Sequence, residues 1–237
     1  MDRREFMQGV GSLGAGGTLP IFDARDGHGY RSSHLKVAVV AMGGILGEVF
    51  RYPHPKLPLK ARTIAINTCY GRPSLHNADQ RIVLGEGVDQ PARPEMAARL
   101  ARAQLSYIQS AVTGFQVVFL VAGLGGAAGT GISPVVAEIL HKRGTLTLAY
   151  VIKPFNWEGE RRRATANAGI EALRPIVDAL MVTSNDHFAA LADAGAMLEA
   201  VLQQAPKDFW THCRRALDRA VSRAGIQDWC ETRRELR

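Results

Sequence analysis

A short apolar run followed by a glycine-rich loop is the feature that most restricts how this chain can fold. The run, Val117–Val121, is made of β-branched and large apolar residues, and Gly123–Gly131 holds five glycines and two alanines in nine residues. Ser133 and Pro134 then supply an N-cap residue and a proline suited to the first helical position. The sequence therefore predicts a buried strand, a tight loop and a helix from Ser133 to about His141.

From residue 35 onward, short β-branched runs alternate with segments of helical periodicity. We predict strands at Leu35–Val40, Thr63–Asn67, Gln116–Ala122, Thr145–Ile152 and Ala179–Thr183. We predict further helices at Pro94–Val112, Gly159–Ile176, Asp186–Asp193 and Ala196–Ala224, with a kink or a break at Pro206. This order indicates an α/β fold with a mostly parallel sheet, in which ligands bind beyond the carboxyl ends of strands.

The glycine loop has the composition of a phosphate-binding loop. Glycines let backbone N–H groups converge on an anion, and the helix that follows adds its positive dipole end. The structural alternative is a loop kept small only to pack the strand tightly on the helix. A Walker loop is excluded because no lysine occurs here. Gly123-x-Gly125-x-x-Ala128 fits the dinucleotide fingerprint, but the next predicted strand runs into Lys153 where an acidic ribose contact is required. A nicotinamide-dependent (NADP-type) oxidoreductase is therefore disfavoured.

Composition excludes several other classes of protein. The chain has 237 residues, 29 Lys and Arg against 22 Asp and Glu, and 46% hydrophobic residues, which suits one or two globular domains. Three scattered cysteines fit neither a disulfide scaffold nor a zinc site, so we predict no metal centre. The basic residues are dispersed, so we predict no specific nucleic-acid partner. The uncharged stretch between Arg102 and Glu138 contains glycines and glutamines, and we predict no membrane span.

The first residues form a weakly patterned, glycine-rich segment. Arg3 and Arg4, followed by Phe6 and a glycine-rich stretch, resemble the start of a twin-arginine export signal. An A-x-A cleavage site is absent, and five glycines interrupt the apolar part before Asp23. We expect residues 1–34 to be a flexible segment and the protein to be cytoplasmic, with export as the minority alternative.

Three segments, in the right order, resemble the tubulin/FtsZ family of GTP-binding cytoskeletal proteins. Gly125–Gly131 is similar to the family's phosphate loop GGGTGTG, Pro134–Glu138 reads PVVAE as in the bacterial branch, and Lys153–Gly159 matches KPF-x-x-EG. The resemblance implies a Rossmann-like, three-layer nucleotide-binding domain over residues 35–225, including the family's central helix. It also implies a short C-terminal stub at 226–237 in place of the family's second domain.

The resemblance further implies a set of contacts to GTP or GDP, with Mg²⁺ accompanying GTP. The phosphates would lie on the glycine loop and on the first loop after residue 42, while Glu158 and Arg162 would contact ribose and guanine. Asp208 is the candidate for the family's guanine-facing acid on the central helix. The implied binding residues are Gly43, Gly44, Gly125, Gly126, Ala127, Ala128, Gly129, Thr130, Gly131, Glu158, Arg162 and Asp208.

Departures from the family pattern decide the expected activity. Ala127 and Ala128 stand where the family has Gly and Thr, Cys69 replaces an Asp, and Gly225–Glu231 lacks the family's Asn-x-Asp. We assign no catalytic residue. We expect an FtsZ-like, guanine-nucleotide-binding accessory protein of a cell-division filament, with little GTPase activity alone and with full-length FtsZ or itself as partner. The alternative is a pseudo-GTPase that keeps the fold as an interaction module.

Overall fold

A computed structural model describes residues 36–43, 61–68, 77–85, 93–192 and 197–222. In these residues six parallel strands form one sheet of order β3-β2-β1-β4-β5-β6. The strands are β1 (Val37–Met42), β2 (Ala61–Asn67), β3 (Gln80–Val83), β4 (Val117–Gly123), β5 (Leu146–Lys153) and β6 (Ala179–Ser184). The helices are α2 (Pro94–Ala103), α3 (Leu105–Val112), α4 (Ala127–Lys142), α5 (Glu160–Leu173), α6 (Asn185–Leu191), α7 (Leu198–Leu202) and α8 (Gln204–Ser222), with a 3₁₀ turn η4 (Asn156–Glu158).

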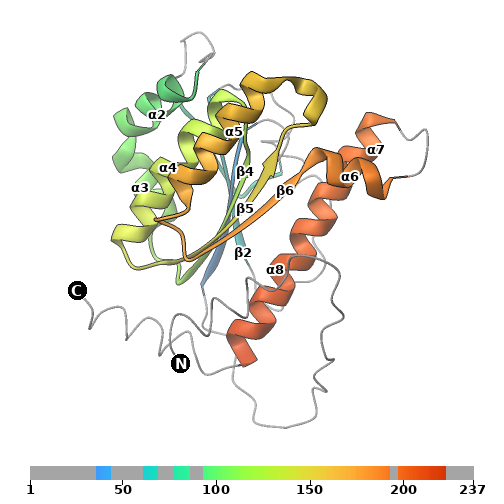
Figure 1. Ribbon diagram of the computed structural model, residues 1–237. Helices are drawn as coiled ribbons and strands as arrows, with labels where there is room; N and C mark the ends of the chain where they lie inside the picture. The colour runs from blue at the N-terminus through green and yellow to red at the C-terminus, as the bar shows by residue number, and fades with distance from the viewer. Residues whose placement is uncertain (1–35, 44–60, 69–76, 86–92, 193–196, 223–237) are drawn as a thin grey trace.

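The sheet lies between two helical layers. Helices α2 to α5 cover one face, and the long helix α8 runs along the other (Figure 1). Alternate residues of each strand therefore enter different cores: Val118 and Leu120 pack under α4, whereas Val117 and Phe119 pack with Phe209 of α8. Burial on both faces explains why the central strands read as nearly continuous apolar runs. The predicted α/β fold with a parallel sheet is confirmed.

Most predicted elements occur, with two differences besides the start of α4. The expected helix 94–112 is divided at Gln104 into α2 and α3. Strand β3, only four residues long, was not predicted, because its sequence QRIV has no extended β-branched run. The break expected at Pro206 is present: α7 ends at Leu202, and α8 begins at Gln204 with Pro206 in its first turn. Across the part of the chain that the structure describes, no helix has the length and apolar character needed to cross a bilayer.

The predicted start of α4 at Ser133 is wrong. The helix begins at Ala127, and Ser133 lies inside it, where its hydroxyl donates to the Gly129 carbonyl at 2.7 Å. The reason is the close packing of the first helical turns. A Cβ on Gly129 would lie 2.0 Å from the Gly123 carbonyl oxygen, and one on Gly131 would lie 2.1 Å from the Pro94 carbonyl oxygen. Packing therefore accounts for these two glycines and places the helix start at the strand end.

Candidate nucleotide-binding site

The ends of β1, β4 and β5 meet at the carboxyl edge of the sheet. Met42 pairs with Ala122, and Gly123 pairs with Ile152, so the three strands end at nearly the same level. Gly43, with φ of +87°, continues from β1 towards α4, because a Cβ on it would lie 3.2 Å from the Gly129 nitrogen. Gly44 lies outside the described residues. The described ends of these three strands therefore lie together at the carboxyl edge, where a ligand is expected.

The first turn of α4 is only partly buried at Gly126, Ala127 and Ala128. Gly126 is its N-cap residue, and glycine has no side chain with which to cap the helix. Ala127, Ala128 and Gly129 are the first helical residues, and the N–H groups at a helix start have no partner within the helix. These N–H groups, with the positive end of a 16-residue helix dipole, form a site suited to a phosphate.

Thr130 organises the loop from within. Its buried hydroxyl accepts a hydrogen bond from the Gly125 N–H at 2.9 Å. Gly125 has φ of +94°, and a Cβ on it would lie 2.9 Å from the Arg162 carbonyl oxygen. The Gly125 N–H is thus used inside the protein, and the donors at the helix start that remain for a ligand begin at Gly126.

Replacing Thr130 with Val is expected to destabilise the protein by about 1–3 kcal/mol, because the Gly125 N–H loses its acceptor in a buried place. Chemical denaturation followed by circular dichroism measures the change. Thr130→Ser keeps the hydroxyl and is expected to recover most of the loss. Equal stability of Thr130→Val and the wild type would show that this hydrogen bond does not hold the loop.

Glu158 and Arg162 form an ion pair next to this helix start. One Glu158 carboxylate oxygen accepts from the Phe155 N–H at 2.7 Å, and the other lies 2.6 Å from Arg162 Nη1. Arg162 Nη2 lies 3.8 Å from the place that a Cβ on Gly126 would take. The half-exposed guanidinium and the positive end of α4 therefore face the same space. An anion placed there would be attracted to both.

Asn67, at the end of β2, has an unpaired donor at the same edge. Its Oδ1 accepts from the Thr68 N–H at 2.8 Å, while its buried Nδ2 has no partner among the described residues. Our set of expected contacts did not include Asn67. The sequence feature that points to Asn67 is a polar residue placed directly after the apolar run Ile64–Ile66.

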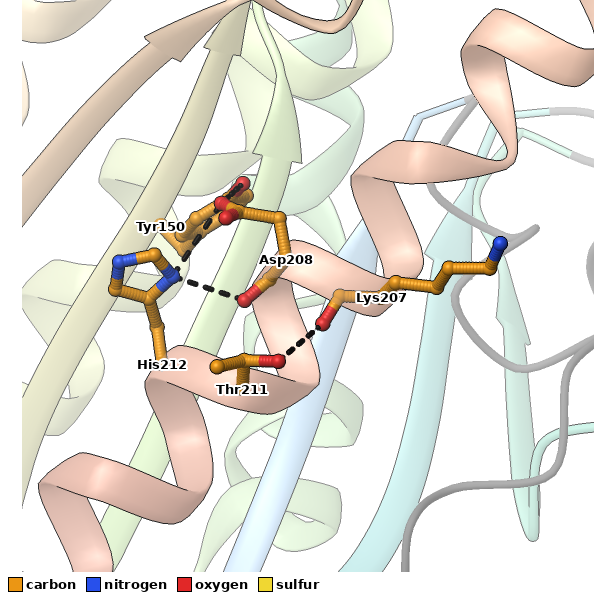
Figure 2. Close-up of polar contacts among 5 residues, drawn as sticks. All are labelled: Tyr150, Lys207, Asp208, Thr211 and His212. Atoms are coloured by element: carbon orange, nitrogen blue, oxygen red, sulfur yellow. Dashed lines mark hydrogen bonds and ion pairs between the residues drawn. The ribbon is translucent and has the colours of Figure 1, made fainter. Parts of the chain in front are cut away.

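Asp208 is held away from this group. It lies on α8, and its Oδ2 accepts from the Tyr150 hydroxyl at 2.6 Å and lies 3.3 Å from His212 Nδ1 (Figure 2). Tyr150 stands three residues before Lys153, the end of β5, which corresponds to about 10 Å along a strand. The structure thus brings Gly43, Gly126, Glu158 and Arg162 to one edge and engages Asp208 in a separate cluster.

Comparison with known proteins agrees with this arrangement. Residues 44–193 match the family model described as the tubulin/FtsZ family, GTPase domain. The cell division protein FtsZ 2 of Rhizobium meliloti is 34% identical over 163 residues, which cover 67% of this chain and 47% of that protein. The chain thus spans about half the length of this relative.

Solved structures share the fold. An FtsZ dimer from M. jannaschii has a TM-score of 0.67 and 29% identity, and the match covers 78% of this chain and 55% of that one. CetZ from Methanosaeta thermophila has a TM-score of 0.67 at 18% identity, covering 82% of this chain and 57% of that one, a likeness of fold alone. The sequence match over most of the chain and the common sheet show that this chain belongs to the tubulin/FtsZ family through its GTPase domain.

Proposed function

We propose that this chain binds GTP or GDP at the carboxyl edge of its sheet. The observation that carries the proposal is the open N-terminus of α4 with the Arg162 guanidinium beside it. The phosphates would accept hydrogen bonds from the N–H groups of Gly126, Ala127 and Ala128, and Asn67 Nδ2 would supply a further donor. Mg²⁺ would accompany GTP, held mainly by the phosphate oxygens and water, as is usual for this ion.

The base and the ribose would lie near η4 and the start of α5. Glu158 is fixed by the Phe155 N–H, so its second oxygen is oriented to accept from a ribose hydroxyl once Arg162 turns to the ligand. A nicotinamide-dependent reaction has less support, because the residue that ends β5 is Lys153 and not the acid that a ribose contact requires.

The proposal is tested by thermal unfolding in the presence of nucleotides. A ligand that binds only the folded state raises the melting temperature by mass action. Saturating GTP and GDP are expected to raise it, and ATP much less. Absence of a shift with millimolar GTP or GDP would contradict nucleotide binding and favour the alternative, a pseudo-GTPase that serves as an interaction module.

Restoring the family's threonine is expected to tighten binding. Ala128 is the second residue of α4, where a hydroxyl would reach a phosphate oxygen, and a hydrogen bond to a charged group is worth about 1.5–3 kcal/mol. Ala128→Thr should therefore bind GDP about tenfold or more tightly in a calorimetric titration. Ala128→Val, equal in shape but without the hydroxyl, is the control. Equal affinities of the two variants would place the phosphate elsewhere.

We further propose an accessory role in a tubulin-like filament, in the cytoplasm, with negligible GTP turnover by the protein alone. Two sequence features support this: the altered phosphate loop at Ala127 and Ala128, and the absence of Asn-x-Asp from Gly225–Glu231. Orienting water towards a γ-phosphate is a strict positioning task, which a carboxylate outside that pattern is not arranged to perform.

Phosphate release and light scattering test the accessory role. Each is measured with this protein alone and then with a complete FtsZ from the same cell. We expect neither turnover nor filaments alone, and a change in the turnover or length of FtsZ filaments in the mixture. GTP-dependent polymers formed by this chain alone would contradict the proposal. It would also be contradicted if adding this chain changed neither the turnover nor the length of FtsZ filaments.

A further inference from the structure

A hydrogen bond from Tyr150 to Asp208 joins α8 to the sheet, and His212 pairs with Asp208 within α8; we call these three residues the Tyr–Asp–His cluster. Tyr150 comes from the middle of β5 and is 2% exposed, while Asp208 and His212 stand one turn apart on α8 (Figure 2). The Tyr150 hydroxyl donates to Asp208 Oδ2 at 2.6 Å. His212 Nδ1 lies 2.9 Å from the Asp208 carbonyl oxygen and 3.3 Å from Oδ2. Asp208 Oδ2 therefore makes the contact between α8 and β5, and His212 supports that carboxylate from one turn further along the same helix.

The electrostatics of the cluster favour a charged pair. Burial, and then Asp208, raise the pKa of Tyr150 far above its usual range, so the phenol stays a hydrogen-bond donor. Burial acts to raise the pKa of Asp208, but hydrogen bonds from His212 and Tyr150 outweigh it, and the pKa is lowered. The hydrogen bond to Asp208 raises the pKa of His212 against the opposing effect of burial. The imidazolium is thus stabilised by the carboxylate beside it.

Other charged and titratable groups face the cluster from the same elements and from α6. Arg215, on the next turn of α8, lowers the pKa of His212, and His187 of α6 lowers that of Asp208. Cys213 is fully buried, and burial raises the pKa of its thiol well above the usual range, so it stays neutral. Of the three members of the cluster, His212 is the one whose charge changes near neutral pH.

Helix α6 contacts both this cluster and the nucleotide-site loop. Asp186 accepts from the Asn156 N–H, with both carboxylate oxygens within 3.2 Å, and so holds η4, which contains Glu158. The next residue, His187, acts on Asp208, and Phe188 is completely buried in the core shared with Tyr150 and Phe209. Helix α6 thus connects the core beneath α8 with the turn that carries Glu158.

We propose that the Tyr–Asp–His cluster is a pH-sensitive latch that holds α8 on β5 and, through α6, sets the affinity of the nucleotide site. The latch is inferred from the contacts among β5, α6 and α8 and does not depend on nucleotide binding. Its coupling to affinity rests on the proposed nucleotide binding, and the two parts are tested separately.

The direction of the effect follows from linkage. The folded protein binds the His212 proton more tightly than the unfolded chain, whose histidine has a pKa of about 6.5. The stabilisation is fully present below that unfolded value and is lost as pH rises through the folded pKa. Helix α8 is therefore held more firmly at about pH 6 than at about pH 8.

Amide hydrogen exchange without nucleotide tests the latch. Protection of the α8 amides, corrected for the intrinsic pH dependence of exchange, is expected to fall several-fold from about pH 6 to about pH 8 in the wild type. In His212→Gln, which keeps a hydrogen-bonding side chain without the charge, protection should not depend on pH. His141→Gln is the matched control, since His141 bonds the Ile176 carbonyl on the opposite layer and its loss should leave the response intact. A pH response that survives in His212→Gln would overturn the latch.

If His212→Gln does not fold, the wild type still decides the question. The imidazole resonances of His212 titrate in nuclear magnetic resonance, and the latch requires a pKa above that of a histidine in an unstructured peptide. A value at or below the peptide's would overturn the proposal.

Coupling is tested by GDP titration at the same two pH values. The quantity to compare is the GDP affinity of the wild type divided by that of His212→Gln at the same pH. This ratio should fall several-fold between about pH 6 and about pH 8. The titration of the phosphate itself affects both proteins equally and therefore cancels. A ratio independent of pH, with the exchange result intact, would overturn the coupling alone. If GDP does not bind at either pH, the proposed function fails, and the exchange result still decides the latch.

Discussion

Replacing Gly129 with Ala is expected to destabilise the folded protein severely. The added Cβ would lie 2.0 Å from the Gly123 carbonyl oxygen and 3.0 Å from its carbon, so it meets backbone and not a side chain that can turn away. Relief requires α4 to move from the end of β4, a strand at the centre of the sheet. We expect a loss of more than about 4 kcal/mol in the free energy of unfolding, a large part of the 5–15 kcal/mol typical of a domain.

Denaturant unfolding followed by circular dichroism measures this loss, with Gly144→Ala as the matched control. Gly144 has φ of +69°, but a Cβ on it would meet no atom within 4 Å, so only the backbone cost of about 1–2 kcal/mol applies. An unchanged denaturation midpoint in Gly129→Ala would show that α4 does not pack on the strand end as described.

Arg162→Ala is expected to weaken binding of GDP by about ten- to a hundredfold, because it removes one or more hydrogen bonds to a charged group. Stability should change by about 1 kcal/mol or less, because the Arg162 side chain is 49% exposed and Glu158, although only 11% exposed, keeps its hydrogen bond from the Phe155 N–H. Calorimetric titration gives the affinity, and thermal unfolding without ligand gives the stability.

Arg163→Ala is the control for this prediction. Arg163 is the next residue on α5, pairs with the exposed Glu160 and carries the same charge. If both variants lose the same affinity, the effect is one of net charge, and Arg162 makes no particular contact with the nucleotide.

The fold was predictable where burial on two faces leaves a continuous apolar run. Val117–Val121 and Leu146–Ile152 are such runs, and both are central strands. Strand β3 was not predictable in this way, because it is an edge strand of four residues whose start is fixed by Asp79, which accepts from the Thr63 N–H and hydroxyl of β2. A tertiary hydrogen bond, not a local propensity, sets its position.

The sequence predicts where the candidate site lies, but it predicts less well which role each residue has there. The motif order places Gly126, Glu158 and Arg162 at one edge, and the structure does the same. The sequence does not show that Gly129 and Gly131 face backbone carbonyls or that Tyr150 holds Asp208, because both facts depend on which elements pack together. The roles of the expected binding residues in holding nucleotide stay predictions.

The central claim, that guanine nucleotide occupies the carboxyl edge of the sheet, is tested most directly by titrating GDP into the wild-type chain in a calorimeter. We predict one saturable site with a dissociation constant of about micromolar or weaker, a large loss of affinity in Arg162→Ala, and little or no heat from ADP. Absence of saturable binding at millimolar GDP, or binding that Arg162→Ala leaves unchanged, would contradict the claim.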